Sequence, residues 1–123
     1  MNNSRPLIIF ADDDEDLLRL VKIKLTSQGF DVKLCLNGEK IISLAAVEKP
    51  DVILLDITME GVDGRELCRL LKTNHATATI PVILISGNDN LENIAGIYGA
   101  DDYVTKPFNT HIVKQKIDHL LAA

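Results

Sequence analysis

The sequence predicts an α/β fold, in which a parallel sheet is covered by helices on both faces. Five short apolar segments alternate with five segments whose apolar residues recur at helical spacing, and this alternation is typical of parallel sheets. Three of the apolar segments, 7–10, 51–56 and 81–86, are nearly continuous runs of Ile, Leu and Val, as strands buried on both faces are. We therefore expect a single sheet between two helical layers.

Each predicted strand precedes a predicted helix. In chain order the strands are residues 7–10, 31–35, 51–56, 81–86 and 101–105. The helices are indicated by apolar residues that repeat along one helical face. In the same order, these residues are Leu17, Val21 and Leu25; Ile41, Leu44 and Ala45; Leu67, Leu70 and Leu71; Leu91, Ile94, Ala95 and Tyr98; and Ile112, Val113, Ile117, Leu120 and Leu121.

Glycines mark several boundaries of these helical segments. Gly29 follows the first helix and Gly99 follows the fourth, in both cases as a stop signal. The second helix begins after Asn37-Gly38, and the third begins after Gly64. The five strand–helix pairs leave no linker or low-complexity tract between them, so no second domain is expected.

Length and composition limit the class of protein. With 123 residues, 46% of them hydrophobic, the chain is expected to form one domain with a substantial core. The net charge of −5, without a basic stripe, argues against direct nucleic-acid binding. No apolar run approaches the roughly 20 residues of a membrane helix, and the opening MNNSRP lacks the features of a secretory signal. We expect no membrane association.

The cysteines and histidines do not suggest a metal or redox site. Cys35 and Cys68 lie in apolar segments and form no CxxC pair, which favours reduced core residues in a cytoplasmic protein. The histidines lack the spacing of metal ligands; they are His75, His111 and His119.

Charged and hydroxyl side chains follow four of the five predicted strands. Asp12 and Asp13 follow the first strand, Asp56 ends the third, Ser86 ends the fourth and Lys106 follows the fifth. Ligands of open α/β sheets bind outside the carboxyl ends of the strands, so these side chains are expected to converge on one edge. Asp56 is the hardest to explain structurally, because an aspartate beside a core requires a partner.

Three further acids beside this edge need no binding site to explain them. Asp14, Glu15 and Asp16 come where the first helix begins. Aspartate is a favoured N-cap residue, and acidic side chains in a first turn suit the helix dipole. We therefore interpret these acids as the start of the helix.

The convergent side chains indicate a cation and a phosphoryl group. Hard oxygen ligands suit Mg²⁺, which would remove the mutual repulsion of the carboxylates. Lys106 and Ser86 offer donors for phosphate oxygens. Asp56 is then a candidate nucleophile, since carboxylates form aspartyl-phosphate intermediates.

At this point the residues resemble a known family. The aspartates at 12–13, DITMEGVDG at 56–64, Ser86 and GADDYVTKPF at 99–108 look like the receiver domain of two-component response regulators, especially chemotaxis-type single-domain regulators. The resemblance covers about residues 6–121 and implies one receiver domain over 1–123. It also implies a flavodoxin-like, doubly wound (βα)5 three-layer sandwich with strand order 2-1-3-4-5, whose site lies between strands 1 and 3.

The resemblance implies a metal site and a phosphoacceptor. Asp56 would accept the phosphoryl group. Asp13 would ligate Mg²⁺ directly, together with Asp56 and the backbone carbonyl of Thr58, while Asp12 would act mainly through a metal-bound water. Mn²⁺ would be a substitute metal.

The resemblance also implies a switch. Lys106 would pair with the phosphoryl group, and Ser86 would form a hydrogen bond to it. The Lys106–Pro107 peptide bond would be cis. Tyr103 would turn inward when Ser86 moves, whereas Tyr98 would serve mainly in packing. The residues two positions after Asp56 and Ser86, which would tune hydrolysis, are Thr58 and Asn88.

Two positions depart from the family pattern. The usual proline after Met59 is Glu60 here, which is expected to leave the loop freer and to add a negative charge near the metal. Gly87 replaces the commoner alanine and is expected to loosen its loop.

The function implied is regulatory rather than enzymatic: a phosphoprotein of a phosphorelay that autophosphorylates and autodephosphorylates. A histidine kinase or a histidine-containing phosphotransfer protein would donate the phosphoryl group, and an undetermined target or output domain would respond. The alternative is a receiver-like interaction module that is not phosphorylated.

Two other classes are disfavoured. A phosphatase of the haloacid dehalogenase type would need an aspartate where Thr58 stands. An FMN-binding flavodoxin would need phosphate donors in the first loop, where three aspartates would repel the ligand.

Overall fold

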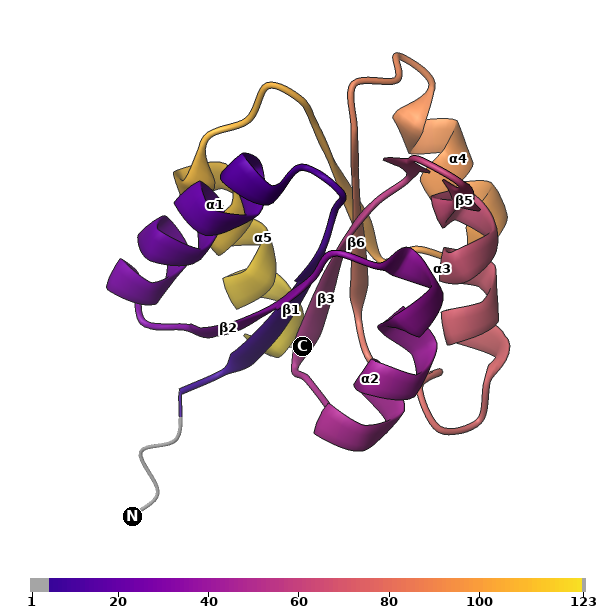
Figure 1. Ribbon diagram of the computed structural model, residues 1–123, viewed down its shortest axis with the longest axis horizontal. Coiled ribbons are helices and arrows are strands. Elements are labelled where there is room, and N and C mark those ends of the chain that lie inside the picture. Colours follow the sequence, from indigo (N-terminus) through magenta and orange to yellow (C-terminus); the bar gives the residue numbers. More distant parts are fainter. Residues whose placement is uncertain (1–4, 123) are drawn as a thin grey trace.

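The apolar segments form a five-stranded parallel sheet, as the sequence predicts. The computed structural model describes residues 5–122 (Figure 1). The strands are β1 (Leu7–Ala11), β2 (Asp31–Cys35), β3 (Val52–Asp56), β6 (Val82–Ser86) and β7 (Asp102–Thr105). They lie in the order β2-β1-β3-β6-β7 and all pair in parallel, which confirms the predicted order 2-1-3-4-5. The expected domain limits, 1 and 123, lie outside the described residues.

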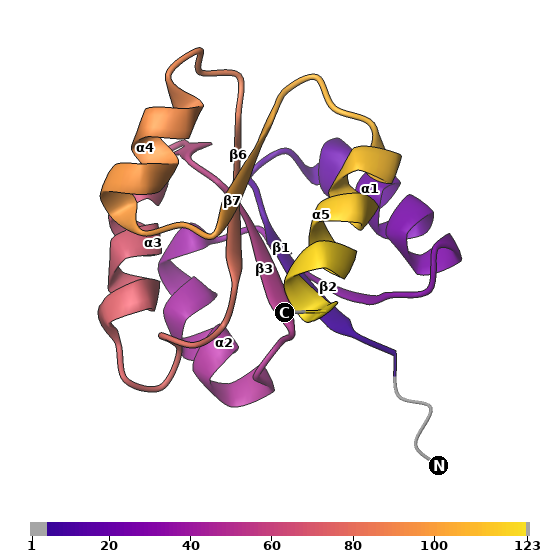
Figure 2. The same cartoon turned by 180° about the vertical axis from the view of Figure 1, so that it is seen from behind.

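Five helices cover the two faces of the sheet. They are α1 (Glu15–Ser27), α2 (Ile41–Glu48), α3 (Gly64–Thr73), α4 (Leu91–Tyr98) and α5 (Thr110–Ala122). α1 and α5 pack side by side on one face, whereas α2, α3 and α4 follow one another across the other (Figures 1 and 2). The sheet is therefore the middle of three layers, as the doubly wound arrangement requires.

Two apolar clusters show why the central strands are apolar throughout. All five residues of β3 and all five of β6 are buried. Alternate residues of β3 point to opposite faces: Ile53 packs with α2, α3 and α4, and Leu54 packs with α1 and α5. A strand in such a position has no solvent-facing side, so the alternation of polar and apolar residues disappears.

The helices lie where the sequence predicts them, but some residues predicted to face the core are exposed. On α3 the buried positions are Gly64, Leu67, Cys68 and Leu71, while the predicted Leu70 is 44% exposed. On α5, Ile112 and Leu121 are also exposed, and on α1 Leu18 is buried in place of the half-buried Leu17. The stripes contained more apolar residues than one helical face can bury, so the outermost of them reach solvent.

Three short elements did not appear among the predicted ones. A 3₁₀ turn, Gly38–Lys40, precedes α2, and a two-stranded hairpin, β4 (Thr58–Met59) and β5 (Val62–Asp63), precedes α3. Strands of two residues are too short to show an alternation of side chains. The hairpin matters for the site because it begins two residues after Asp56.

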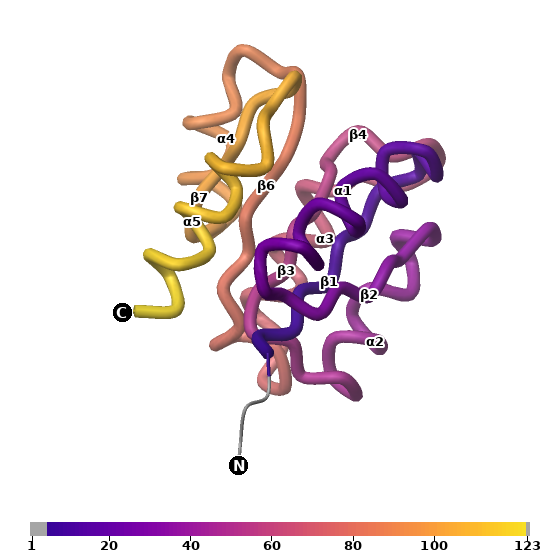
Figure 3. Tube along the Cα trace, turned by 90° about the vertical axis from the view of Figure 1, so that its left-hand side faces the viewer, coloured from indigo at the N-terminus to yellow at the C-terminus, as the bar shows by residue number. Residues whose placement is uncertain are grey.

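The carboxyl ends of the strands open on one edge of the sheet. The loops after β1, β3 and β6 lie at the end of the molecule opposite the start of β1 (Figure 3). Cys35 and Cys68 are buried and free, as predicted. In the described part of the chain, no helix has both the length and the apolar character needed to cross a bilayer.

Asp14 is the N-cap of α1, as predicted, and its removal gives a testable loss of stability. Its side chain accepts a hydrogen bond from the Leu17 N–H at 3.1 Å. We expect Asp14→Ala to lower the free energy of unfolding by about 1 kcal/mol, because the N–H loses its acceptor. Urea unfolding checks this, with Asp16→Ala as the control from the same turn. Equal losses in the two variants would show that charge rather than capping is responsible.

Candidate functional site

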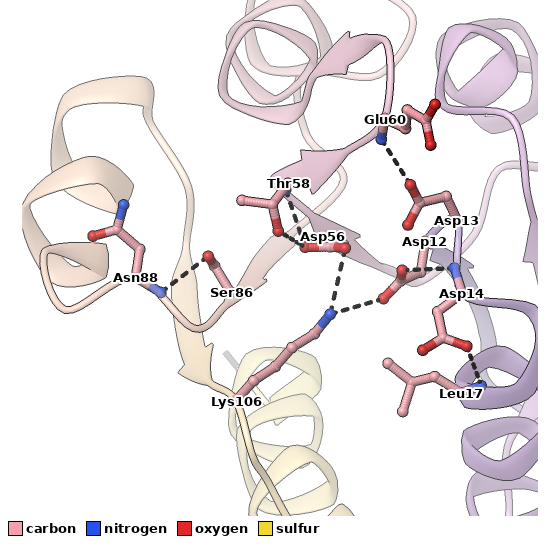
Figure 4. A network of polar contacts seen from close by, with 10 residues as sticks. All are labelled: Asp12, Asp13, Asp14, Leu17, Asp56, Thr58, Glu60, Ser86, Asn88 and Lys106. Atoms are coloured by element: carbon pink, nitrogen blue, oxygen red, sulfur yellow. Dashed lines mark hydrogen bonds and ion pairs between the residues drawn. The ribbon is translucent and has the colours of Figure 1, made fainter.

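The structure brings the predicted polar residues together at the carboxyl edge of the sheet. Asp12 directly follows β1, Asp56 ends β3, Ser86 ends β6 and Lys106 follows β7 (Figure 4). Asp12, Asp56 and Ser86 are almost completely buried, with 0%, 2% and 1% of their surface exposed. Polar groups are rarely buried to this extent without partners, so their contacts define the site.

Lys106 links the two buried aspartates. Its Nζ lies 3.2 Å from Oδ2 of Asp12 and 3.4 Å from Oδ2 of Asp56. Its backbone N–H donates to the carbonyl of Ser86 at 2.8 Å, which fixes the start of the loop after β7. The Lys106–Pro107 peptide bond is cis. One ammonium therefore faces two carboxylates, and a net negative charge remains between the strands.

The electrostatics of this cluster follow from its burial. Desolvation raises the pKa of Asp12 to about 6, helped by the charge of Asp56 and opposed by the Asp14 N–H and by Lys106. Burial alone would lower the pKa of Lys106, but the attraction of Asp56 and Asp12 raises it above its ordinary value. The lysine thus remains charged, while the charge on Asp12 is the one that the environment disfavours.

The acidic side chains have the arrangement of a cation site. One carboxylate oxygen from each of Asp12, Asp13 and Asp56 lies within 4.8 Å of the others. Asp13 is exposed, so the cluster is open to solvent on one side. Hard oxygen ligands of this kind suit Mg²⁺, which binds through one or two carboxylates and keeps several waters. The residues present therefore fit a divalent cation.

The β4–β5 hairpin holds two of these carboxylates. Both the backbone N–H and the hydroxyl of Thr58 donate to Oδ1 of Asp56, at 3.1 Å and 3.0 Å. The backbone N–H of Glu60 donates to Oδ2 of Asp13 at 2.7 Å (Figure 4). The sequence did not predict these hydrogen bonds: Thr58 was expected to offer its backbone carbonyl to the metal and to tune hydrolysis, not to donate to Asp56. The expectation that Glu60 leaves this loop freer than a proline would stays a prediction, but the Glu60 N–H is bonded to Asp13.

The remaining candidate residues lie around this centre rather than in it. The hydroxyl of Ser86 accepts from the Asn88 N–H at 3.1 Å, so it faces its own loop. Tyr103 is half-buried on β7; its hydroxyl lies 3.4 Å from Glu92 of α4, and the Nζ of Lys116 lies 5.3 Å from its ring centroid. Tyr98 packs partly buried against the core on the α2–α4 face. Tyr103 thus joins the sheet edge to both α4 and α5.

Comparison with known proteins shows a family. The family described as "Response regulator receiver domain" matches residues 8–118. The response regulator PleD of Caulobacter vibrioides is 40% identical over 104 residues, which are 83% of this chain and 23% of PleD. The chain thus spans about a quarter of the length of that relative.

Solved structures agree with this family. The chain superposes with a TM-score of 0.91 on a candidate response regulator from Chloroflexus aurantiacus, at 24% identity over 98% of this chain and 100% of that one. It superposes with a TM-score of 0.85 on the BeF3-activated N-terminal receiver domain of RstA from Klebsiella pneumoniae, at 28% identity over 95% and 99% of the two chains. The first likeness concerns the fold alone.

Proposed function

The chain belongs to the response regulator receiver domain family, and from that premise we propose that it accepts a phosphoryl group on Asp56. The donor would be the phosphohistidine of a histidine kinase or of a histidine-containing phosphotransfer protein. The observation that carries the proposal is the burial of Asp56 beside Asp12 and Lys106, at the edge of the sheet where ligands of such folds bind. Membership of this family does not favour the alternative of a module that is never phosphorylated.

The proposed chemistry uses the residues of the site in distinct ways. A carboxylate oxygen of Asp56 attacks the phosphorus atom, the bond from phosphorus to the donor imidazole nitrogen breaks, and the imidazole keeps the electron pair. The product is an acyl phosphate on Asp56. The ammonium of Lys106, which already faces Asp56, neutralises a phosphoryl oxygen. The hydroxyl of Ser86 donates to another oxygen once it leaves the Asn88 N–H.

Asp12, Asp13, Asp56 and the carbonyl of Thr58 would hold a divalent cation, Mg²⁺ or Mn²⁺ in its place. The closeness of the three carboxylates supports this assignment. The cation would supply positive charge where a negative phosphoryl group approaches negative carboxylates. Asp12 would act mainly through a metal-bound water, because its Oδ2 already faces Lys106.

The switch would run from Ser86 to Tyr103. When Ser86 turns toward the phosphoryl group, the β6–α4 loop loses the contact to Asn88, and the space beside it becomes available to the Tyr103 ring. Tyr103 would then leave Glu92, so the surface formed by α4, β7 and α5 would change. The RstA receiver domain in its BeF3-activated form supports an activated state of this fold.

The scope of the proposal is regulatory. The receiver domain would span residues 1–123, act in the cytoplasm, and catalyse only its own phosphorylation and dephosphorylation, with Thr58 and Asn88 tuning hydrolysis. Its downstream partner would be a protein target or output domain, without direct binding of nucleic acid or membrane. A pocket of about 470 Å³ lies between α1 and the loop after β7 and is lined by Leu17, Leu20, Lys24, Phe108 and Lys106. It would give the phosphodonor protein a largely apolar contact beside the site.

Intact mass spectrometry tests the acceptor. The protein is incubated with acetyl phosphate in Mg²⁺ and, separately, in a metal chelator. We expect one phosphoryl adduct on the wild type in Mg²⁺ and none with the chelator, because unscreened carboxylates repel the anionic donor. Asp56→Asn should form no adduct, since an amide is no nucleophile here.

Asp51→Asn is the matched control for that experiment, because Asp51 lies at the opposite end of β3 and is exposed. It should form the adduct as the wild type does. An adduct on Asp56→Asn, at the wild-type level, would show that the phosphoryl group is carried elsewhere and would refute the proposed acceptor.

A further inference from the structure

We infer that the backbone N–H of Glu60 is a positioning group for Asp13, one of the proposed metal ligands. This inference rests on the metal site of the proposed function and adds to it a main-chain group that holds the exposed ligand. The N–H donates to Oδ2 of Asp13 at 2.7 Å, across 47 residues of sequence. No other hydrogen bond or ion pair within the described residues links the tip of the hairpin to the loop after β1.

The turn of the hairpin leaves this N–H available. Thr58 pairs with Asp63 and Met59 pairs with Val62, so the loop consists of Glu60 and Gly61. Gly61 has a φ of +75°, whereas Glu60 is not among the residues with positive φ. This combination is that of a type II turn, in which the first loop residue takes no part in the cross-strand hydrogen bond. The Glu60 N–H can therefore be used outside the hairpin.

Asp13 requires such a partner more than the other two acids do. Asp12 and Asp56 are buried and are held by Lys106, whereas Asp13 is exposed, and within the described residues its side chain accepts a hydrogen bond from the Glu60 N–H alone. A carboxylate has two oxygens, so a donor fixed on Oδ2 leaves Oδ1 for a cation. Hydrogen bonds that orient metal ligands in this way typically change metal affinity by 10–100-fold.

The residue type at position 60 decides whether the bond exists. Proline has no N–H and could not hold Asp13 through its main chain. Glu60→Pro would nevertheless fit the fold, because proline is favoured at the first loop position of a type II turn. Its demand for an extended preceding residue is met by Met59, which belongs to β4. The substitution therefore removes the donor and keeps the turn.

Charge must be separated from the hydrogen bond. The Glu60 side chain is exposed and carries a negative charge near the site, and Glu60→Pro removes this charge as well. Glu60→Gln removes the charge but keeps the N–H, so it is the matched control. Because Glu60→Pro and Glu60→Gln both lack this charge, the difference between them isolates the hydrogen bond.

The experiment measures the dissociation constant of Mg²⁺ by isothermal titration calorimetry for the wild type, Glu60→Gln and Glu60→Pro in 0.15 M salt. We expect Glu60→Gln to bind no more tightly than the wild type, because it loses a negative charge near the site, and Glu60→Pro to bind about tenfold more weakly than Glu60→Gln. Equal affinity of the two variants would overturn the inference and leave the metal site intact. No binding by the wild type would overturn the proposed metal site, and the inference with it.

Hydrogen exchange provides a second test that does not depend on the folding of Glu60→Pro. In the metal-free wild type, the Glu60 amide should exchange slowly for an exposed loop residue, because its N–H is bonded to Asp13. Asp13→Ala should speed its exchange about tenfold or more, while Asp16→Ala, one turn away on α1, should not. An amide that exchanges equally fast in the wild type and in Asp13→Ala would overturn the inference.

Discussion

Replacing Gly64 with alanine is expected to lower the free energy of unfolding by about 3 kcal/mol, because the added methyl group has no space. A Cβ at this position would lie 2.4 Å from Cα of Ile57 and 2.6 Å from the carbonyl oxygen of Asp56. Both are backbone atoms at the end of β3, which is fixed between β1 and β6. Neither neighbour can turn aside as a flexible side chain would.

The same substitution should disturb the proposed acceptor. Gly64 begins α3, and its N–H donates to the carbonyl of Ile57 at 3.3 Å. Moving α3 away to admit the methyl group would break this bond and displace the peptide unit that carries Asp56. We therefore expect the rate of phosphorylation by acetyl phosphate to fall even at temperatures at which the Gly64→Ala variant is still folded.

Gly96→Ala is the matched control for Gly64→Ala. Gly96 lies within α4, and a Cβ added there would meet no atom within 4 Å. Alanine is favoured over glycine in a helix by about 1 kcal/mol, so this variant should be slightly more stable than the wild type. Urea unfolding of both variants gives the comparison. A loss smaller than about 1 kcal/mol in Gly64→Ala would mean that α3 and β3 can separate at little cost.

The sheet and the buried part of the site could be predicted from the sequence because both depend on local patterns. A strand buried on both faces, such as β3, is a continuous apolar run, and the residues that end such runs must meet at one edge of a parallel sheet. Asp12, Asp56, Ser86 and Lys106 were found in this way, and the structure brings them together.

The contacts of the hairpin could not be predicted in the same way. The donors to Asp56 and Asp13 include the backbone N–H groups of Thr58 and Glu60, and every non-proline residue has such a group. Which N–H faces a carboxylate depends on the two-residue turn and on the close packing of Gly64 against Ile57. These are tertiary facts, so the sequence showed only that position 60 was not proline.

The exposed apolar residues show a second limit. Leu70, on α3, extends the predicted stripe, yet 44% of its surface is exposed. Cys68 takes the buried place instead, and its Sγ lies 3.6 Å from the carbonyl of Tyr98 on α4. The period of a helix indicates a face about 100° wide, but the neighbouring helix decides where on that face the core ends.

Asp12→Asn is expected to stabilise the metal-free protein at pH 7.5 by about 3 kcal/mol. The carboxylate of Asp12 is completely buried, and desolvation raises its pKa from 3.8 to about 6. Since each pKa unit corresponds to about 1.4 kcal/mol, the charged form destabilises the fold by about 3 kcal/mol at neutral pH. Asparagine keeps an oxygen for the Asp14 N–H and removes the charge that faces Asp56.

The effect should depend on pH in a direction that the raised pKa fixes. The folded state binds the proton of Asp12 more tightly than the unfolded state does. The stability contributed by this group is therefore fully present below pH 3.8 and is lost as the pH rises through about 6. The difference between Asp12→Asn and the wild type should be close to zero near pH 4 and should reach its full size above pH 6.

Urea unfolding in a metal chelator at pH 4, 5, 6 and 7.5 measures this difference, and repeating it in Mg²⁺ connects it to the proposed site. A cation that binds only the folded state stabilises it, so Mg²⁺ should raise the stability of the wild type more than that of Asp12→Asn. The variant keeps Lys106 paired with Asp56, so it should remain folded throughout.

If Asp12→Asn were instead less stable than the wild type at pH 7.5, the ion pair with Lys106 would outweigh desolvation. Asp12 would then contribute to the fold without needing a cation. If Asp12→Asn is more stable than the wild type without metal, the carboxylate of Asp12 destabilises the metal-free domain, and the bound cation offsets this destabilisation.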